Sequence, residues 1–126
     1  MAAILSCRYP AIMPRWIWIL LVFALVGPPP GRANTYRVQM TAGNQFSLPV
    51  TNILRGDTIT WTNVSGFNHT STSGSPPGTP DGRWDSGTVL AGKSYSHPFL
   101  GAGVFRYYCT IHFLGGMTGA VVVAES

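Results

Sequence analysis

The sequence predicts an all-β domain over residues 34–126, folded as a Greek-key β-sandwich or barrel. Three observations lead to this fold class. Several short segments alternate apolar and polar residues with a period of two, which is typical of half-buried strands. Turn signals rich in glycine separate them, and no amphipathic segment is longer than a turn or two of helix. Residues 34–126 are long enough for one small domain with a single hydrophobic core and too short for two such domains.

Five segments are the expected strands. Residues 36–41 alternate apolar and polar side chains, and residues 57–63 repeat the pattern. The other expected strands are residues 93–99, 104–109 and 119–124. Residues 71–82 are rich in Ser, Gly, Pro and Thr and have no periodicity, so we expect a loop there.

Residues 1–33 have the layout of a secretory signal peptide. Two arginines and no acidic residue precede an apolar run at 16–26, and prolines and small residues follow it. A membrane-spanning helix needs ~20 apolar residues, about twice this run. We therefore expect cleavage near Ala33–Asn34 rather than retention as an anchor. The product would be an exported domain, periplasmic or otherwise extracytoplasmic, with no stable membrane insertion.

Loss of the leader changes the charge and cysteine content. It removes three of the eight basic residues and none of the four acidic ones, which lowers the net charge from +4 to +1. No basic patch then suggests a nucleic-acid partner. Cys7 also leaves, so Cys109 is the single remaining thiol and a disulfide within the expected monomer is excluded. An unpaired cysteine in an oxidising compartment needs a reason, and metal ligation supplies one.

The run from Cys109 to Met117 carries three metal-binding side chains. A thiolate, the imidazole of His112 and a thioether follow one another within this run, just after an expected strand. Soft sulfur ligands with imidazole favour copper over hard cations. A plane of two His and one Cys with a weak axial Met is the ligand set of a blue-copper electron-transfer centre, so one more imidazole would complete the set.

Two histidines remain as candidates for that imidazole. An isolated His near a strand is more often packed or solvated than a ligand. His97 directly precedes Pro98, and we interpret it as a structural or surface residue. His69 is therefore the better candidate. The predicted centre holds one type 1 copper ion per chain, cycling between Cu(I) and Cu(II), with the candidate ligands His69, Cys109, His112 and Met117.

The region from about residue 45 to residue 123, which is most of the expected mature chain, resembles the cupredoxin family, with a ligand loop as long as in plastocyanins and pseudoazurins. The matching motifs are Gly56-Asp57-Thr58-Ile59-Thr60-Trp61-Thr62-Asn63, His69-Thr70, Gly103-Val104-Phe105-Arg106-Tyr107-Tyr108-Cys109, His112, Met117 and Gly119. The resemblance implies an eight-stranded Greek-key sandwich, one type 1 copper and reversible single-electron transfer. It also implies strong ligands at His69, Cys109 and His112 and a weak axial one at Met117.

Two positions depart from the family pattern. Ile111 stands where these relatives commonly have Pro, and Thr70 stands where they often have Asn. In the family, the residue at the position of Thr70 helps to tie the two ligand loops together through a hydrogen bond. A threonine hydroxyl can donate such a bond, but with a shorter reach. This departure bears on the rigidity of the loop and on the reduction potential, and not on the identity of the metal.

The sequence thus predicts a small carrier of single electrons between redox partner proteins. We expect these partners to dock near His112, Phe113 and Leu114, since electron-transfer encounters use small interfaces. Phe113 and Leu114 could instead only pack the loop. The alternative function is a periplasmic copper carrier or buffer without an electron-transfer role, and a metal-free secreted β-module is a third interpretation.

We do not expect an enzyme. Three His in the whole chain are too few for an additional trinuclear copper centre, and the single Cys on the ligand loop is too few for a dinuclear one. No nucleophile elbow or similar motif supports hydrolysis either.

Overall fold

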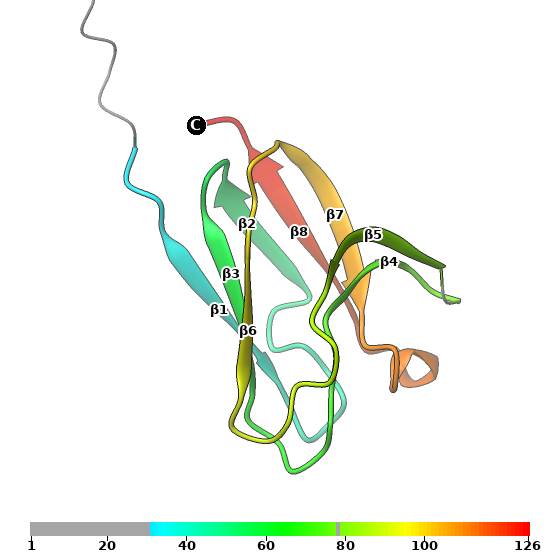
Figure 1. Ribbon diagram of the computed structural model, residues 1–126. Helices are drawn as coiled ribbons and strands as arrows, with labels where there is room; N and C mark the ends of the chain where they lie inside the picture. Colours follow the sequence, from blue (N-terminus) through cyan, green and yellow to red (C-terminus); the bar gives the residue numbers. More distant parts are fainter. Residues whose placement is uncertain (1–30, 78) are drawn as a thin grey trace, which may run out of the picture. The chain divides into compact units, whose positions relative to one another are not determined.

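The computed structural model describes residues 31–77 and 79–126 of the chain. Most of the predicted signal peptide, residues 1–30, lies outside the described residues. Residues Arg32–Ser126 form one compact unit of strands with one short 3₁₀ turn, η1 (Phe113–Gly115) (Figure 1). No helix in this described part is both long enough and apolar enough to span a membrane.

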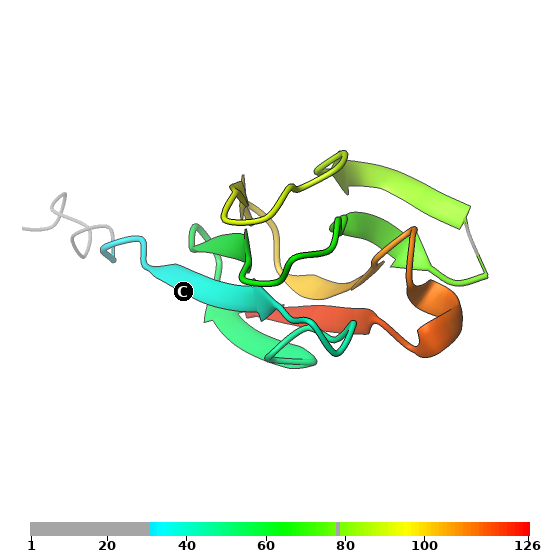
Figure 2. The same ribbon diagram turned by 90° about the horizontal axis from the view of Figure 1, so that it is seen from below.

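The strands form two sheets that face each other as the layers of a sandwich (Figure 2). The first sheet has the order β1 (Thr35–Met40), β3 (Thr58–Asn63), β6 (Ser94–Pro98). The second has the order β2 (Val50–Leu54), β8 (Thr118–Ala124), β7 (Gly103–Tyr108), β4 (Thr72–Ser75), β5 (Thr79–Asp85). The pairs β1–β3 and β2–β8 are parallel, and the other pairs are antiparallel. The predicted all-β sandwich is confirmed.

The five predicted strands correspond to β1, β3, β6, β7 and β8. The expected loop over residues 71–82 is wrong, because most of it belongs to β4 and β5. Small polar side chains carry no period-two signal, yet here they complete the sheet. The Ser73 hydroxyl accepts the backbone N–H groups of Arg83 and Trp84 and donates to the Trp84 carbonyl. Strand β4 pairs with β7, where Thr72 lies opposite Tyr108. This pairing attaches β4 and β5 to the rest of the second sheet.

Strand alternation builds the core between the two sheets. In β3, Ile59 and Trp61 are fully buried while the threonines between them are half-buried. In β7 the Tyr107 ring packs edge-on against Trp61, with ring centroids 5.3 Å apart. Burying each large apolar side chain contributes about 1.5–3 kcal/mol. Cys109 follows Tyr107 on the same face of the chain, so the core ends in a buried thiol.

Candidate metal centre

Three of the four predicted ligands converge at the end of the sandwich where β3 and β7 finish. His69 lies in the connection from β3 to β4, Cys109 directly follows β7, and His112 precedes η1. Their donor atoms all lie within 4.8 Å of one another. The Cys109 Sγ is 4.0 Å from His69 Nδ1 and 3.5 Å from His112 Nδ1. Both imidazoles therefore present the same ring nitrogen to the thiol.

These separations suit a trigonal metal site. Metal–nitrogen and metal–sulfur bonds of about 2.0 and 2.3 Å, as zinc makes, set at about 120°, put the nitrogen and sulfur atoms roughly 3.7 Å apart. The two observed sulfur–nitrogen distances lie on either side of this value. One thiolate and two imidazoles, with Met117 on the same loop, suit copper, whereas the hard cations prefer oxygen ligands. The residues present thus fit a type 1 copper ion.

The ligand loop closes onto its own start and brings Met117 back beside Cys109. The Cys109 N–H donates to the Met117 carbonyl at 3.0 Å, and the Met117 N–H donates to the His112 carbonyl at 3.4 Å. Gly116 turns the chain with φ of 84°, a left-handed conformation that favours glycine. The preceding Gly115 does not have a positive φ. The Met117 side chain is fully buried with the core.

Thr70 links the two ligand-bearing segments. Its backbone N–H donates to Cys109 Sγ at 3.4 Å, which suits a sulfur that carries negative charge. Its hydroxyl oxygen accepts the Thr110 N–H at 2.8 Å and lies 3.1 Å from the Thr110 hydroxyl. The threonine therefore joins the two loops by a hydrogen bond despite its short side chain.

His69 is completely enclosed. Its backbone pairs with Val89, with N–H to carbonyl distances of 3.3 and 2.8 Å. Burial lowers the pKa of His69, and nearby His112 lowers it further, while a hydrogen bond to the Thr41 backbone acts in the opposite direction. The neutral ring is the form that binds a metal. The second ring nitrogen, Nε2, lies 2.9 Å from the Ser65 hydroxyl, a contact that no sequence motif indicated.

The residues around His112 divide into packed and exposed ones. The Phe113 ring stands edge-on to Tyr108 at 6.0 Å, and Tyr108 is almost fully buried. Leu114 is 90% exposed and Ile111 is 50% exposed, while His112 is half-buried. Phe113 thus packs the loop, whereas Leu114 does not. Ile111 adds an exposed apolar side chain that the sequence interpretation did not include.

His97 lies away from this cluster, as predicted. Its ring stacks on Trp84 at 5.0 Å and meets Phe99 edge-on at 5.1 Å. Burial lowers the pKa of His97. These contacts give it a packing role at the other face of the aromatic core.

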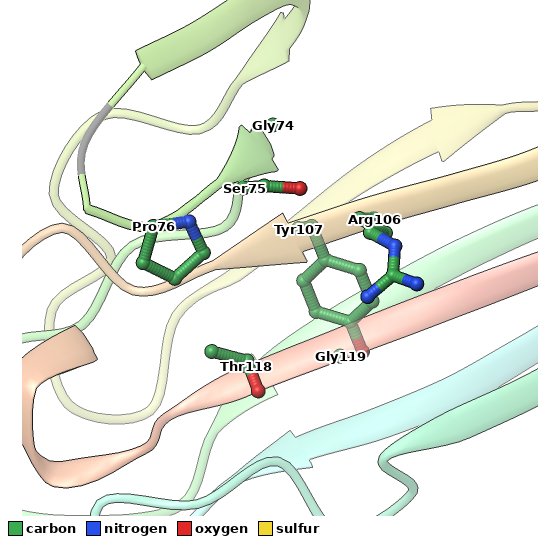
Figure 3. A pocket seen from close by; sticks show the side chains of 7 residues that line it. All are labelled: Gly74, Ser75, Pro76, Arg106, Tyr107, Thr118 and Gly119. Atoms are coloured by element: carbon green, nitrogen blue, oxygen red, sulfur yellow. The ribbon is translucent and has the colours of Figure 1, made fainter.

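A hollow of about 180 Å³ opens elsewhere on the second sheet, around β4, β7 and β8 (Figure 3). It is lined by Gly74, Ser75, Pro76, Arg106, Tyr107, Thr118 and Gly119. None of the four candidate ligands lines it. The candidate metal centre is therefore the cluster of donor atoms, and this hollow is not part of it.

Comparisons with known proteins agree with this geometry. Residues 34–124 match the model of the copper binding proteins of the plastocyanin/azurin family. A chloroplastic plastocyanin of Tetradesmus obliquus is 32% identical over 99 residues, which cover 72% of this chain and 68% of the relative.

Two solved structures show the same fold. A purple cupredoxin from Nitrosopumilus maritimus superposes with a TM-score of 0.62 at 25% identity, covering 70% of this chain and 98% of that one. A single-residue variant of amicyanin in its Cu(I) state gives a TM-score of 0.61 at 26% identity, covering 71% and 82%. Together with the donor cluster, these matches mean that the chain belongs to the plastocyanin/azurin family of copper-binding proteins.

Proposed function

We propose that this protein is a small exported blue-copper protein that carries single electrons between redox partners. The observation that carries the proposal is the triangle of Cys109 Sγ and the two Nδ1 atoms of His69 and His112. These three residues, together with Met117, would hold the copper ion. When bound, copper supplies a one-electron couple between Cu(I) and Cu(II).

The surrounding chain keeps these ligands in place. Cys109 and His69 are fully buried, so water has no direct access to either donor. The backbone bonds that close the ligand loop and the Thr70 link between the segments restrain the donors from moving. A site that moves little when its charge changes needs little reorganisation, which favours fast electron transfer.

The proposed exit for electrons is the half-buried His112. Ile111 and Leu114 beside it expose apolar side chains, and small apolar contacts suit the brief docking of redox partners. We propose that donor and acceptor proteins dock on this surface, that the protein acts as a monomer, and that it has no catalytic role of its own.

Copper titration of residues 34–126 tests the site. We expect an intense visible charge-transfer band at one Cu(II) per chain, which disappears in Cys109→Ala. A matched pair of histidine variants tests the ligand choice: His69→Gln should lose the band and His97→Gln should keep it, because of these two histidines only His69 faces the thiol. In Met117→Leu we expect the band to persist and the reduction potential to rise, since the axial ligand tunes it. A weak band in the unsubstituted protein would contradict the proposal.

Electrochemistry separates electron transfer from copper storage. A carrier gives a reversible one-electron couple and fast self-exchange, whereas a buffer binds Cu(I) tightly and oxidises sluggishly or irreversibly. We expect the carrier's behaviour. Replacing Leu114 with Asp should slow exchange with redox partners and leave the visible spectrum unchanged, because this side chain is 90% exposed.

We also propose that residues 1–33 are a signal peptide, which would deliver the unfolded chain to an extracytoplasmic compartment where it acquires copper. The proposal is supported by the order of features in this segment: a positively charged start, then an apolar run, then small residues at the end. Intact mass of the exported protein tests it, with a mature chain that starts at Asn34 as the expected result.

A further inference from the structure

Besides the Thr41 backbone, the Ser65 hydroxyl is the contact of the His69 ring that the copper ligands do not explain. Ser65 is buried, and its Oγ lies 2.9 Å from Nε2, the ring nitrogen of His69 that faces away from Cys109. Which of the two atoms donates this hydrogen bond decides which ring nitrogen of His69 carries the proton. The neighbouring contacts settle that question.

The Asn63 side chain has a fixed orientation. Its Nδ2 donates to the backbone carbonyls of Phe67 at 2.7 Å and Val89 at 2.8 Å, and carbonyls only accept. Its Oδ1 consequently faces Ser65, whose backbone N–H donates to it at 2.9 Å. A flipped amide would lose all three bonds, so Oδ1 is an acceptor with no proton to give.

This fixes the role of the Ser65 hydroxyl. Its Oγ lies 2.8 Å from Asn63 Oδ1, so the one hydroxyl proton must lie between these two oxygens or point at the Phe67 carbonyl 3.2 Å away. The Oγ also accepts the Phe67 N–H at 3.1 Å, which leaves one lone pair. His69 Nε2 can then only donate. The neutral His69 ring carries its proton on Nε2 and directs the Nδ1 lone pair at Cys109 Sγ, 4.0 Å away.

We propose that Ser65 is a positioning residue of the metal centre: its hydroxyl, held by Asn63, fixes the tautomer and the orientation of His69. Metal-bound histidines usually donate their second N–H to a carboxylate, a carbonyl or water. Here a side-chain hydroxyl takes that place. The inference that this serves copper rests on the proposed function, but the tautomer itself does not depend on any metal.

NMR of the metal-free protein, labelled with ¹⁵N in the imidazole rings, tests the inference. In the unsubstituted protein we expect His69 as the Nε2–H tautomer. In Ser65→Ala we expect the Nδ1–H tautomer to become populated and the affinity for Cu(I), measured by competition with a chromophoric chelator, to fall about 10–100-fold. Ser65→Thr, which keeps the hydroxyl, should restore both. Ser96→Ala is the control, because it loses a hydroxyl–hydroxyl bond of 2.8 Å to Thr60 without contact to His69.

Two results would overturn the inference: an Nδ1–H tautomer in the unsubstituted protein, or a Ser65→Ala variant that keeps both the tautomer and the Cu(I) affinity. The first needs no substitution, so it applies even if Ser65→Ala fails to fold. A protein that shows the Nε2–H tautomer and its dependence on Ser65, but forms no blue site, would contradict the proposed function and still support the role of Ser65.

Discussion

The hydroxyl oxygen of Thr70 accepts the backbone N–H of Thr110 at 2.8 Å, although the two residues lie forty positions apart. One hydrogen bond thus joins the segment that carries His69 to the loop that carries Cys109 and His112. Both residues are immediate neighbours of candidate ligands, so the bond acts on the separation of the donor atoms and not only on stability.

We predict that Thr70→Val weakens the fold and loosens the metal site. The substitution keeps the shape of the side chain but removes the acceptor of the Thr110 N–H. Because Thr110 is exposed and water can partly replace the lost bond, we expect a cost of about 0.5–1.5 kcal/mol. Urea denaturation of the metal-free protein measures this loss in the free energy of unfolding, and Cu(I) competition measures the loss of affinity. The control is Thr62→Val, whose hydroxyl contacts only Ser94 on the exposed face of the first sheet. If both variants lower the free energy of unfolding and the Cu(I) affinity equally, the hydrogen bond between the loops does not restrain the metal site.

Gly119 carries a second prediction, because it lies opposite Tyr107 in the pairing of β7 with β8. A Cβ atom at this glycine would lie 2.7 Å from Cε1 of the Tyr107 ring and closer still to its neighbours. The ring is enclosed by Phe46 and Trp61, so it cannot move aside freely. We expect Gly119→Ala to lower the free energy of unfolding by about 1–3 kcal/mol, as overpacking does.

The same substitution should perturb the metal centre, since Tyr107 is two residues from Cys109 on the same strand face. A shift of the visible band would report this. Gly101→Ala is the matched control, because a Cβ there meets nothing within 4 Å and the residue has no positive φ. If both alanine variants unfold at the same urea concentration, the contact between Gly119 and Tyr107 does not restrain the core.

The sequence predicted those parts of the fold and of the site where a pattern of residues is typical of only one kind of structure. Alternating apolar residues such as Ile59 and Trp61 indicate a strand face, and a sulfur-and-imidazole set such as Cys109 and His112 indicates a soft metal. The strands β4 and β5 were missed because Gly and Pro are depleted in strands and this segment has no alternation, and its strand structure comes from the pairing of β4 with β5 and β7. Ser65 was missed for a similar reason: its role comes from contacts with Asn63 and His69 that exist only in the folded chain.

A third prediction concerns pH and the metal-free protein. Burial lowers the pKa of His97 below its ordinary value of about 6.5, so the unfolded chain binds a proton there more tightly than the folded one. The stability that depends on the neutral ring is then fully present above about pH 6.5 and is lost as the pH falls through the lowered pKa. We therefore expect the free energy of unfolding to decrease as the pH is lowered from about 7 to about 5.

The variant His97→Phe isolates this group. Phenylalanine keeps an aromatic ring to stack on Trp84 and meet Phe99, but it does not titrate. Denaturation curves measured across the pH range should therefore show a smaller dependence on pH for the variant than for the unsubstituted protein. An unchanged slope would assign the pH dependence to other groups, of which His69 is one because burial lowers its pKa too.

The last prediction concerns the start of the mature chain. The backbone nitrogen of Asn34 donates to Asp57 Oδ1 at 2.7 Å, and the Leu54 N–H donates to the other carboxylate oxygen at 2.9 Å. Asp57 is almost fully buried. Cleavage between Ala33 and Asn34, as proposed, would turn this nitrogen into an α-ammonium group and convert a neutral donor into a charged one. The bond to the carboxylate is charge-assisted in both chains, so cleavage adds only the attraction between the new ammonium and the carboxylate, for which we expect roughly 1 kcal/mol.

A cycle of four proteins measures this pairing: chains that start at residue 34 or at residue 32, each with Asp57 or with Asp57→Asn. The asparagine variant should lose stability in both chains, because its Nδ2 would face either the Asn34 nitrogen or the Leu54 N–H, and each of these is a donor. We expect the loss to be larger by roughly 1 kcal/mol in the chain that starts at Asn34, because only there does the substitution also remove a charge pair. Added salt should narrow the difference, since it screens partly exposed charges. Equal losses in the two chains would mean that the new terminus does not pair with Asp57, whatever the cleavage site is.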